Sequence, residues 1–242
     1  VAKHPELWRG CVGAWNPGLG NTGLVLRDWS GNQNNGTLIG GPTWGVSDGQ
    51  QALNFDGVND YVQITTAANA GAWTYAGWFY FRTLAGANSN PTLLNSGTGV
   101  YFAVGPSSQL QFYGGGSWKN FTGSSVATLR WVHIAISRVS TTLAQAYYNG
   151  ESVGTLAFNA GSLQTSSQIG SRVDAPVQGV DGFVDSVQLY NRALSPNEIR
   201  TLAQRPGIAY ELAPRKTYFI QAATSTSQFY DVLSPLIFAG TN

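Results

Sequence analysis

The sequence has few of the side chains that carry catalysis, metal binding and nucleic-acid binding. It contains one cysteine, two histidines and no methionine, and charged residues make up only 10% of its 242 positions. Because Cys11 is the single cysteine, an internal disulfide and a cysteine-based zinc cluster are excluded. The formal charge is +1 without a long basic run, so we expect no nucleic-acid partner. No stretch approaches the roughly 18 consecutive apolar residues of a membrane span, so we expect none.

Acidic residues that could perform glycoside hydrolysis are also scarce. Such a reaction needs two carboxylates that converge on one bond. The four glutamates are scattered near the N-terminus, in a hairpin turn, at a helix cap and in the C-terminal segment, at positions 6, 151, 198 and 211. His133 lies in an apolar strand pattern without a serine or cysteine nucleophile motif beside it, so we interpret it as a packing residue. The sequence therefore predicts a protein that is not an enzyme.

Glycine and aromatic residues, by contrast, are plentiful. The chain has 30 glycines, 8 tryptophans, 11 tyrosines and 11 phenylalanines, which is typical of β-strands joined by tight turns. Apolar runs predict strands at 74–82, 100–104, 110–113, 131–139 and 143–148. Both parities of 74–82 are apolar, whereas Val132, Ile134 and Ile136 share one side of 131–139. We therefore expect two packed sheets.

The stretch LNFDGVNDYVQI at 53–64 predicts a strand, a loop and a second strand. Apolar residues alternate with polar ones on both sides of the loop. Gly57 supplies a positive φ, and Asp56 and Asp60 can bond to their own backbone. We interpret the two aspartates as turn formers first and as possible neighbours of a calcium ion second.

One helix is predicted near the C-terminal end. Ser195 is a suitable N-cap, Pro196 fits the first helical position, and Glu198 completes a capping box. After Arg205 the sequence changes character, and residues 206–242 mix apolar runs with turn residues. Such an arm would expose much apolar surface unless it packed on something.

Six motifs occur in an order and spacing that resemble the laminin-G-like, concanavalin A-like jelly-roll family, in its bacterial, phage and environmental branch. They are RDWSGNQNNGTLIGGPTW (27–44), ALNFDGVNDYVQI (52–64), WTYAGWFYF (73–81), WVHIAIS (131–137), AYYNGESVGT (146–155) and GFVDSVQLYNRALSPNEI (182–199). The resemblance implies an all-β, antiparallel two-sheet jelly-roll sandwich with a concave face. It implies non-catalytic modules that bind glycans, proteins or neighbouring subunits, often with calcium. We divide the chain into an N-terminal segment 1–11, a jelly-roll domain 12–205 and a C-terminal arm 206–242.

Two aspartates are candidate calcium ligands. Asp28 begins a series of oxygen-bearing residues at alternate positions, although the glycine and the late glutamate of an EF-hand are misplaced. Strand alternation places Asp185 on the same side as Val187 and Leu189, which should face the core. A carboxylate there needs an arginine, backbone N–H groups or a cation as partner. Calcium near Asp28 and Asp185 is one interpretation, and a hydrogen-bonded structural aspartate is the other.

The motif FYGGGSWKNF suggests a binding rim. Tyr113, Trp118 and Asn120 combine aromatic and amide side chains beside glycines, an arrangement that could stack and hydrogen-bond a sugar or a protein partner. Alternatively the rings of Tyr113, Trp118 and Phe121 fill the sandwich core, as aromatic residues often do.

Two functions remain open. The first is a structural subunit of a surface assembly, such as a phage virion decoration or tail-associated protein, whose arm contacts neighbouring subunits. The second is a free carbohydrate-binding module of a secreted or cell-surface protein. Both place the protein on a virion surface or outside the cell.

Overall fold

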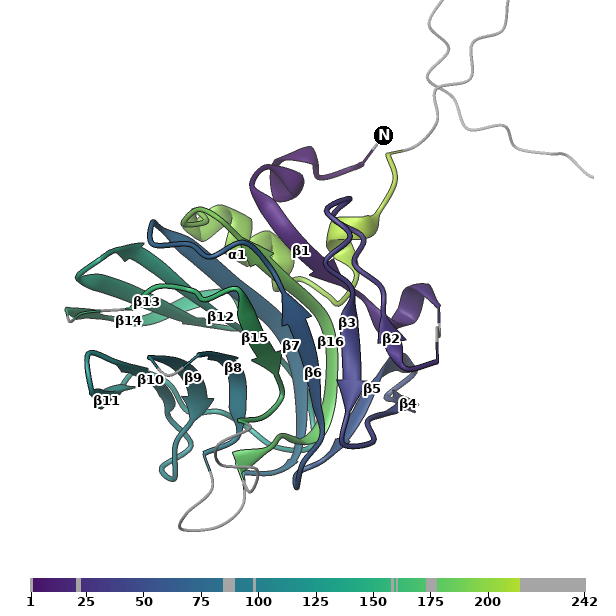
Figure 1. Cartoon of the computed structure of the whole chain (residues 1–242), viewed down its shortest axis with the longest axis horizontal. Helices are drawn as coiled ribbons and strands as arrows, with labels where there is room; N and C mark the ends of the chain where they lie inside the picture. Colours follow the sequence, from purple (N-terminus) through teal and green to yellow (C-terminus); the bar gives the residue numbers. More distant parts are fainter. Residues whose placement is uncertain are drawn as a thin grey trace, which may run out of the picture.

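The computed structural model describes residues 2–20, 23–84, 90–97, 99–157, 159, 161–172 and 178–213. Within these residues sixteen strands form two antiparallel sheets that pack face to face (Figure 1). The all-β jelly-roll sandwich expected from the sequence is therefore confirmed.

The first sheet contains eight strands. Its order is β14 (Glu151–Ala157), β13 (Leu143–Tyr148), β12 (Trp131–Ser140), β7 (Trp73–Thr83), β16 (Asp181–Tyr190), β5 (Gln50–Asp56) and β4 (Thr43–Ser47), with β1 (Cys11–Trp15) paired to β16.

The second sheet also contains eight strands. Its order is β11 (Ser117–Phe121), β10 (Leu110–Gly114), β9 (Val100–Val104), β8 (Thr92–Ser96), β15 (Ser166–Ile169), β6 (Tyr61–Thr65), β3 (Gly36–Ile39) and β2 (Val25–Leu26).

The main core lies between the two sheets, and the alternation of the strands explains its membership. Val132, Ile134 and Ile136 of β12 all point into it, as their spacing predicts. Phe102 of β9 and Phe112 of β10 meet them from the second sheet, and both are fully buried. All five strands predicted from apolar runs are confirmed, with boundaries that differ from the predicted ones by at most one residue.

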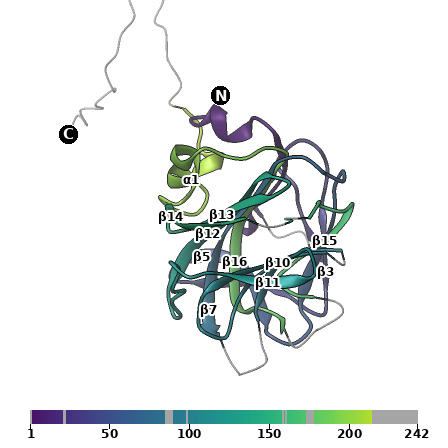
Figure 2. The ribbon, with the colours of Figure 1, turned by 90° about the vertical axis from the view of Figure 1, so that its left-hand side faces the viewer.

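A second apolar cluster covers the outer face of the first sheet. Helix α1 (Pro196–Leu202) and the short 3-10 helices η1 (Pro5–Trp8) and η4 (Ile208–Tyr210) contribute Leu7, Ile199 and Ile208 to it. Figure 2 shows α1 and the N-terminal segment beside β13 and β14, away from β10 and β11. The predicted capping box of α1 is present, with Ser195 and Glu198 bonded to each other's backbone N–H. A third 3-10 helix, η2 (Pro17–Leu19), lies against β5 and β16.

The described part of the C-terminal arm is packed against this cluster. Ile208 and Ala209 are buried, and the Tyr210 ring lies edge-on to Trp8 with ring centroids 5.4 Å apart. The backbone N–H of Lys3 donates to the carbonyl of Glu211 at 2.8 Å. Residues up to 213 therefore join the N-terminal segment on the domain, and residues 214–242 lie outside the described residues. None of the described helices is long and apolar enough to cross a membrane.

Candidate functional site

Six side chains form a row across the outer face of the second sheet. Strand register places them opposite one another in the order Trp118 (β11), Tyr113 (β10), Tyr101 (β9), Asn95 (β8), Gln168 (β15) and Gln63 (β6). Their neighbours Phe102 and Phe112 point into the core. Because successive side chains of a strand point to opposite faces, the row lies on the outer face. We call it the aromatic–amide row.

The aromatic end of the row is a cluster of three rings. The Tyr113 ring centroid lies 5.5 Å from that of Trp118 and 5.2 Å from that of Tyr101. Trp118 and Tyr113 are partly exposed, whereas Tyr101 is only 5% exposed. The Arg172 guanidinium lies 3.9 Å from the centroid of the Tyr101 ring and covers it. The faces and edges of Trp118 and Tyr113 are therefore the ring surface that a ligand can contact.

The amide end of the row is a chain of hydrogen bonds with a fixed direction. Asn95 donates its amide N–H to Gln168, and Gln168 donates to Gln63 Oε1 at 3.2 Å. Gln63 in turn donates to the Ser166 hydroxyl and to the carbonyls of Ile64 and Ser167. Because the N–H groups of the Gln63 amide are used by these three acceptors, its oxygen is left to accept from Gln168. The carbonyl oxygen of each amide in the chain therefore faces the aromatic end of the row.

The structure brings together the three residues predicted as a binding rim. Trp118 lies opposite Tyr113, and Asn120 follows two residues later on the same face of β11, where it is exposed. The alternative, that these rings fill the core, holds only for Phe121, which is 2% exposed and belongs to the core cluster. Sequence reasoning missed the rest of the row, Tyr101, Asn95, Gln168 and Gln63.

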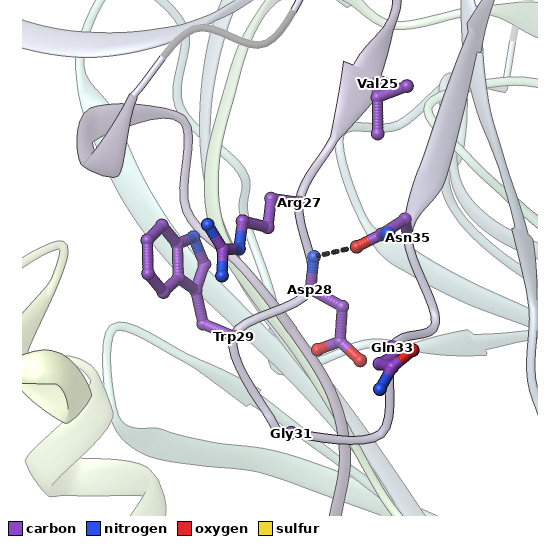
Figure 3. A pocket seen from close by; sticks show the side chains of 7 residues that line it. All are labelled: Val25, Arg27, Asp28, Trp29, Gly31, Gln33 and Asn35. Carbon is purple, nitrogen blue, oxygen red and sulfur yellow. Dashed lines mark hydrogen bonds between the residues drawn. The ribbon is translucent and has the colours of Figure 1, made fainter.

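Asp28 organises a loop against β1. Its carboxylate accepts hydrogen bonds from the backbone N–H groups of Ala14, Ser30 and Asn34 and from the Ser30 hydroxyl, at 2.8–2.9 Å. The side chain is 6% exposed, and four donors fill the usual capacity of a carboxylate. Asp28 N also donates to Asn35 Oδ1 at 2.9 Å (Figure 3).

The Asp28 loop borders a surface hollow of about 540 Å³. Figure 3 shows Arg27 lying against Trp29, while the Asp28 carboxylate points away from that pair. The Arg27 guanidinium is 4.5 Å from the centroid of the Trp29 ring. The exposed lining of this hollow therefore combines the stacked Arg27–Trp29 pair with the small and polar residues Gly31, Gln33 and Asn35 and the side chain of Val25.

Asp185 is buried, but not on the face that the sequence predicted. The register of β16 shifts between Asp185 and Gln188, and Ser186 adopts a positive φ of 48°. This bulge reverses the alternation, so Val187 points into the main core while Asp185 lies opposite Trp78 on the other face. The core-facing placement of Asp185 was therefore wrong, because strict alternation fails across a bulge.

The hydrogen-bond partners of Asp185 are Ser186, through its backbone and its side chain, and the Gln50 amide. Ser186 N donates to it at 2.6 Å, and Gln50 Nε2 donates at 2.8 Å. Burial nevertheless raises the pKa of Asp185 to about 7, because these bonds only partly offset the cost of removing the charge from water.

The loop after β5 is held by the turn chemistry expected of it. Asp60 accepts a hydrogen bond from Asp56 N at 2.9 Å, Asp56 accepts one from Val58 N at 2.8 Å, and Gly57 has a φ of 78°. Burial raises the pKa of Asp60.

Calcium at Asp28 and Asp185 stays a prediction. The two carboxylates share no hydrogen-bond partner, and an ion at either would have to replace donors already in place. Among the described residues, no three histidine, cysteine, aspartate or glutamate side chains lie together as a metal site.

Comparison with known proteins identifies the fold family. A sequence model of the concanavalin A-like lectin/glucanases superfamily matches residues 56–200. A search of the curated proteins gives no match.

Several solved structures share the fold. Domain 4 of AbnA, an extracellular GH43 arabinanase from Geobacillus stearothermophilus in complex with arabinotriose, is 18% identical with a TM-score of 0.63, over 80% of this chain and 98% of that one. The binding domain of Paraclostridial Mosquitocidal Protein 1 is 15% identical with a TM-score of 0.63, over 81% and 52% of the two chains. Trypanosoma rangeli sialidase in complex with sialic acid is 19% identical with a TM-score of 0.61, over 81% and 33%.

At these identities the likeness to solved structures establishes the fold alone. This chain spans about half of the toxin chain and a third of the sialidase chain. The sequence model, in contrast, covers more than half of this chain. The chain therefore belongs to the concanavalin A-like lectin/glucanase superfamily.

Proposed function

We propose that the protein is a non-catalytic carbohydrate-binding module and that the aromatic–amide row is its binding surface. The observation that carries the proposal is the row itself, which places three rings and three amides on one face in strand register. Two of the rings and two of the amides are partly exposed. A sugar presents both an apolar C–H face and hydroxyl edges. Aromatic faces match the first, and amide groups, which both donate and accept, match the second.

The length of the row favours an oligosaccharide over a single sugar. It crosses six strands, from β11 to β6. Since neighbouring strands lie about 4.8 Å apart, the row extends about 24 Å. A linear glycan that lies across the strands can contact the rings of Trp118 and Tyr113 at one end and Gln63 at the other.

The residues of the row support binding rather than hydrolysis. A glycosidase needs two carboxylic acids that flank the scissile bond. The six side chains of the row are aromatic or amide, so the row itself supplies no acid pair. Domain 4 of the arabinanase, one of the solved structures that share this fold, is in complex with arabinotriose.

The assembly function stays a prediction. Residues 206–213 of the arm pack on their own domain, and residues 214–242, which would contact a neighbouring subunit, lie outside the described residues. A role on a virion surface therefore rests on the sequence alone. A secreted or cell-surface location accompanies the glycan-binding proposal.

A binding assay on two tryptophan variants tests the proposal. An array of oligosaccharides identifies a ligand for the whole chain, and calorimetry then compares the variants. We expect Trp118→Ala to bind at least about tenfold more weakly, because the loss of an aromatic ring that stacks on the ligand typically costs more than about 1.4 kcal/mol. Trp29→Ala, which removes the ring beside Arg27 on the Asp28 loop, should bind like the natural protein. Equal affinity of Trp118→Ala and the natural chain would refute the proposed surface.

A further inference from the structure

The amide end of the aromatic–amide row opens into a second hollow of about 470 Å³. Eight described residues line it, namely Asn95, Gly97, Gly99, Ser162, Gln164, Thr165, Ser166 and Gln168. Asn95 and Gln168 belong to both the row and the hollow, so the two form one continuous surface. The lining offers hydroxyl and amide groups and, among these eight, no charged side chain.

Asn95 carries an acceptor without a partner. Its side chain is 6% exposed, and its Oδ1 atom is buried and hydrogen-bonded to none of the described residues. Buried carbonyl oxygens are nearly always hydrogen-bonded, so the donor for Asn95 Oδ1 is a water or another group outside the described residues.

Rotating the Asn95 amide by 180° would not give its oxygen a partner, because the direction of the hydrogen bonds along the three amides is fixed. Gln63 Nε2 is held by three acceptors, so Gln63 Oε1 must accept from Gln168. Gln168 Oε1 then remains to accept from Asn95 Nδ2. A flipped Asn95 would set two carbonyl oxygens against each other. The free acceptor is therefore fixed on the side of Asn95 away from Gln168.

We infer that this hollow is a subsite for a neutral sugar unit whose hydroxyl donates to Asn95 Oδ1, directly or through one water, and that the protein prefers neutral to acidic glycans. The inference rests on the proposed function and deepens it. A hydroxyl can donate to Asn95, whereas a carboxylate or sulfate has only acceptors to offer. An acidic unit would also lose hydration among the neutral groups of the hollow. The Arg172 guanidinium lies over the Tyr101 ring on the row and is not among the residues that line the hollow.

Two variants test the hollow independently. Asn95→Leu removes the acceptor at similar volume, and we expect roughly tenfold weaker binding of a neutral hexaose such as cellohexaose or xylohexaose. Gly99→Phe fills the hollow instead. A Cβ at Gly99 meets no heavy atom within 4 Å, so the new ring enters open space and should abolish hexaose binding without unfolding the chain.

Matched controls place the same changes on the first sheet. Gln145→Leu removes an amide from β13, and Val46→Phe adds a ring at a position of β4 that is 62% exposed. Both should bind the hexaose like the natural chain. Melting temperatures of all four variants show whether each is folded at the assay temperature.

The outcomes separate this inference from the proposed function. Oligogalacturonate, an acidic probe, should bind much more weakly than the neutral hexaoses. If it binds as tightly, or if Asn95→Leu and Gly99→Phe both bind the neutral hexaose normally while Trp118→Ala does not, the neutral subsite is wrong and the binding face stands. If no oligosaccharide binds the natural chain, or if binding survives in Trp118→Ala, the proposed function fails and the subsite fails with it.

Discussion

Two buried titratable groups on the first sheet should make the stability of this protein nearly independent of pH in mild acid. His133 of β12 and Asp185 of β16 lie on either side of Trp78 of β7, each directly opposite it. Both are 0% exposed. Burial lowers the pKa of His133 from 6.5 to about 3 and raises that of Asp185 from 3.8 to about 7.

The two groups act in opposite directions. His133 contributes stability that is present above pH 6.5 and is lost as pH falls towards 3, because the unfolded chain binds a proton that the folded chain does not. Asp185 contributes stability that is present below pH 3.8 and is lost as pH rises towards 7, because the folded chain keeps the proton. Each slope is about 1.4 kcal/mol per pH unit. The pKa of Glu198 is lowered to about 2, mainly by its hydrogen bond with Arg192. The stability that Glu198 contributes to the folded chain is therefore lost only below about pH 4.5.

Single substitutions should reveal each slope between about pH 5 and 6.5. Asp185→Asn leaves His133 unopposed, so the free energy of unfolding should fall by about 2 kcal/mol relative to the natural chain on acidification across this range. His133→Leu leaves Asp185 unopposed, and the free energy should rise by a similar amount. Urea unfolding followed by tryptophan fluorescence at several pH values measures both.

The double variant is the control, since it removes both titrations. Its free energy of unfolding should differ from that of the natural chain by an amount that stays constant with pH. Other acidic groups titrate alike in all four proteins and cancel in these differences. If both single variants follow the natural profile, the reasoning about burial is wrong.

Two further predictions concern calcium and the arm. If calcium binds at Asp28, about 1 mM CaCl₂ should raise the melting temperature of the natural chain and not that of Asp28→Ala; an unchanged melting temperature in the natural chain would contradict the site. A chain that ends after Arg205 should be at least about 2 kcal/mol less stable than one that ends after Ala213, because it loses the buried Ile208. Light scattering on the whole chain and on the chain ending at Ala213 then tests assembly. Residues 214–242 make subunit contacts only if the whole chain has the mass of an oligomer and the shorter chain has that of a monomer.

Local patterns were sufficient to predict most of the fold. The strands at 100–104 and 143–148 match their apolar runs, and the capping box at Ser195 begins α1 as expected. Two of the six residues of the row were equally local, because β10 and β11 form a hairpin around Gly115 and Gly116, which sets Tyr113 opposite Trp118.

The amide end of the row depends on pairings between strands that are distant in sequence. Asn95 and Gln168 are 73 residues apart, and Gln168 and Gln63 are 105 apart. Nothing in either neighbourhood specifies this register, which follows from the way both sheets close around one core. The bulge at Ser186 is a similar case, since the positive φ of this residue within β16 moved Asp185 to the opposite face. Position within a strand therefore predicts which face a side chain occupies only where the pairing is unbroken, and a site assembled across six strands requires the structure.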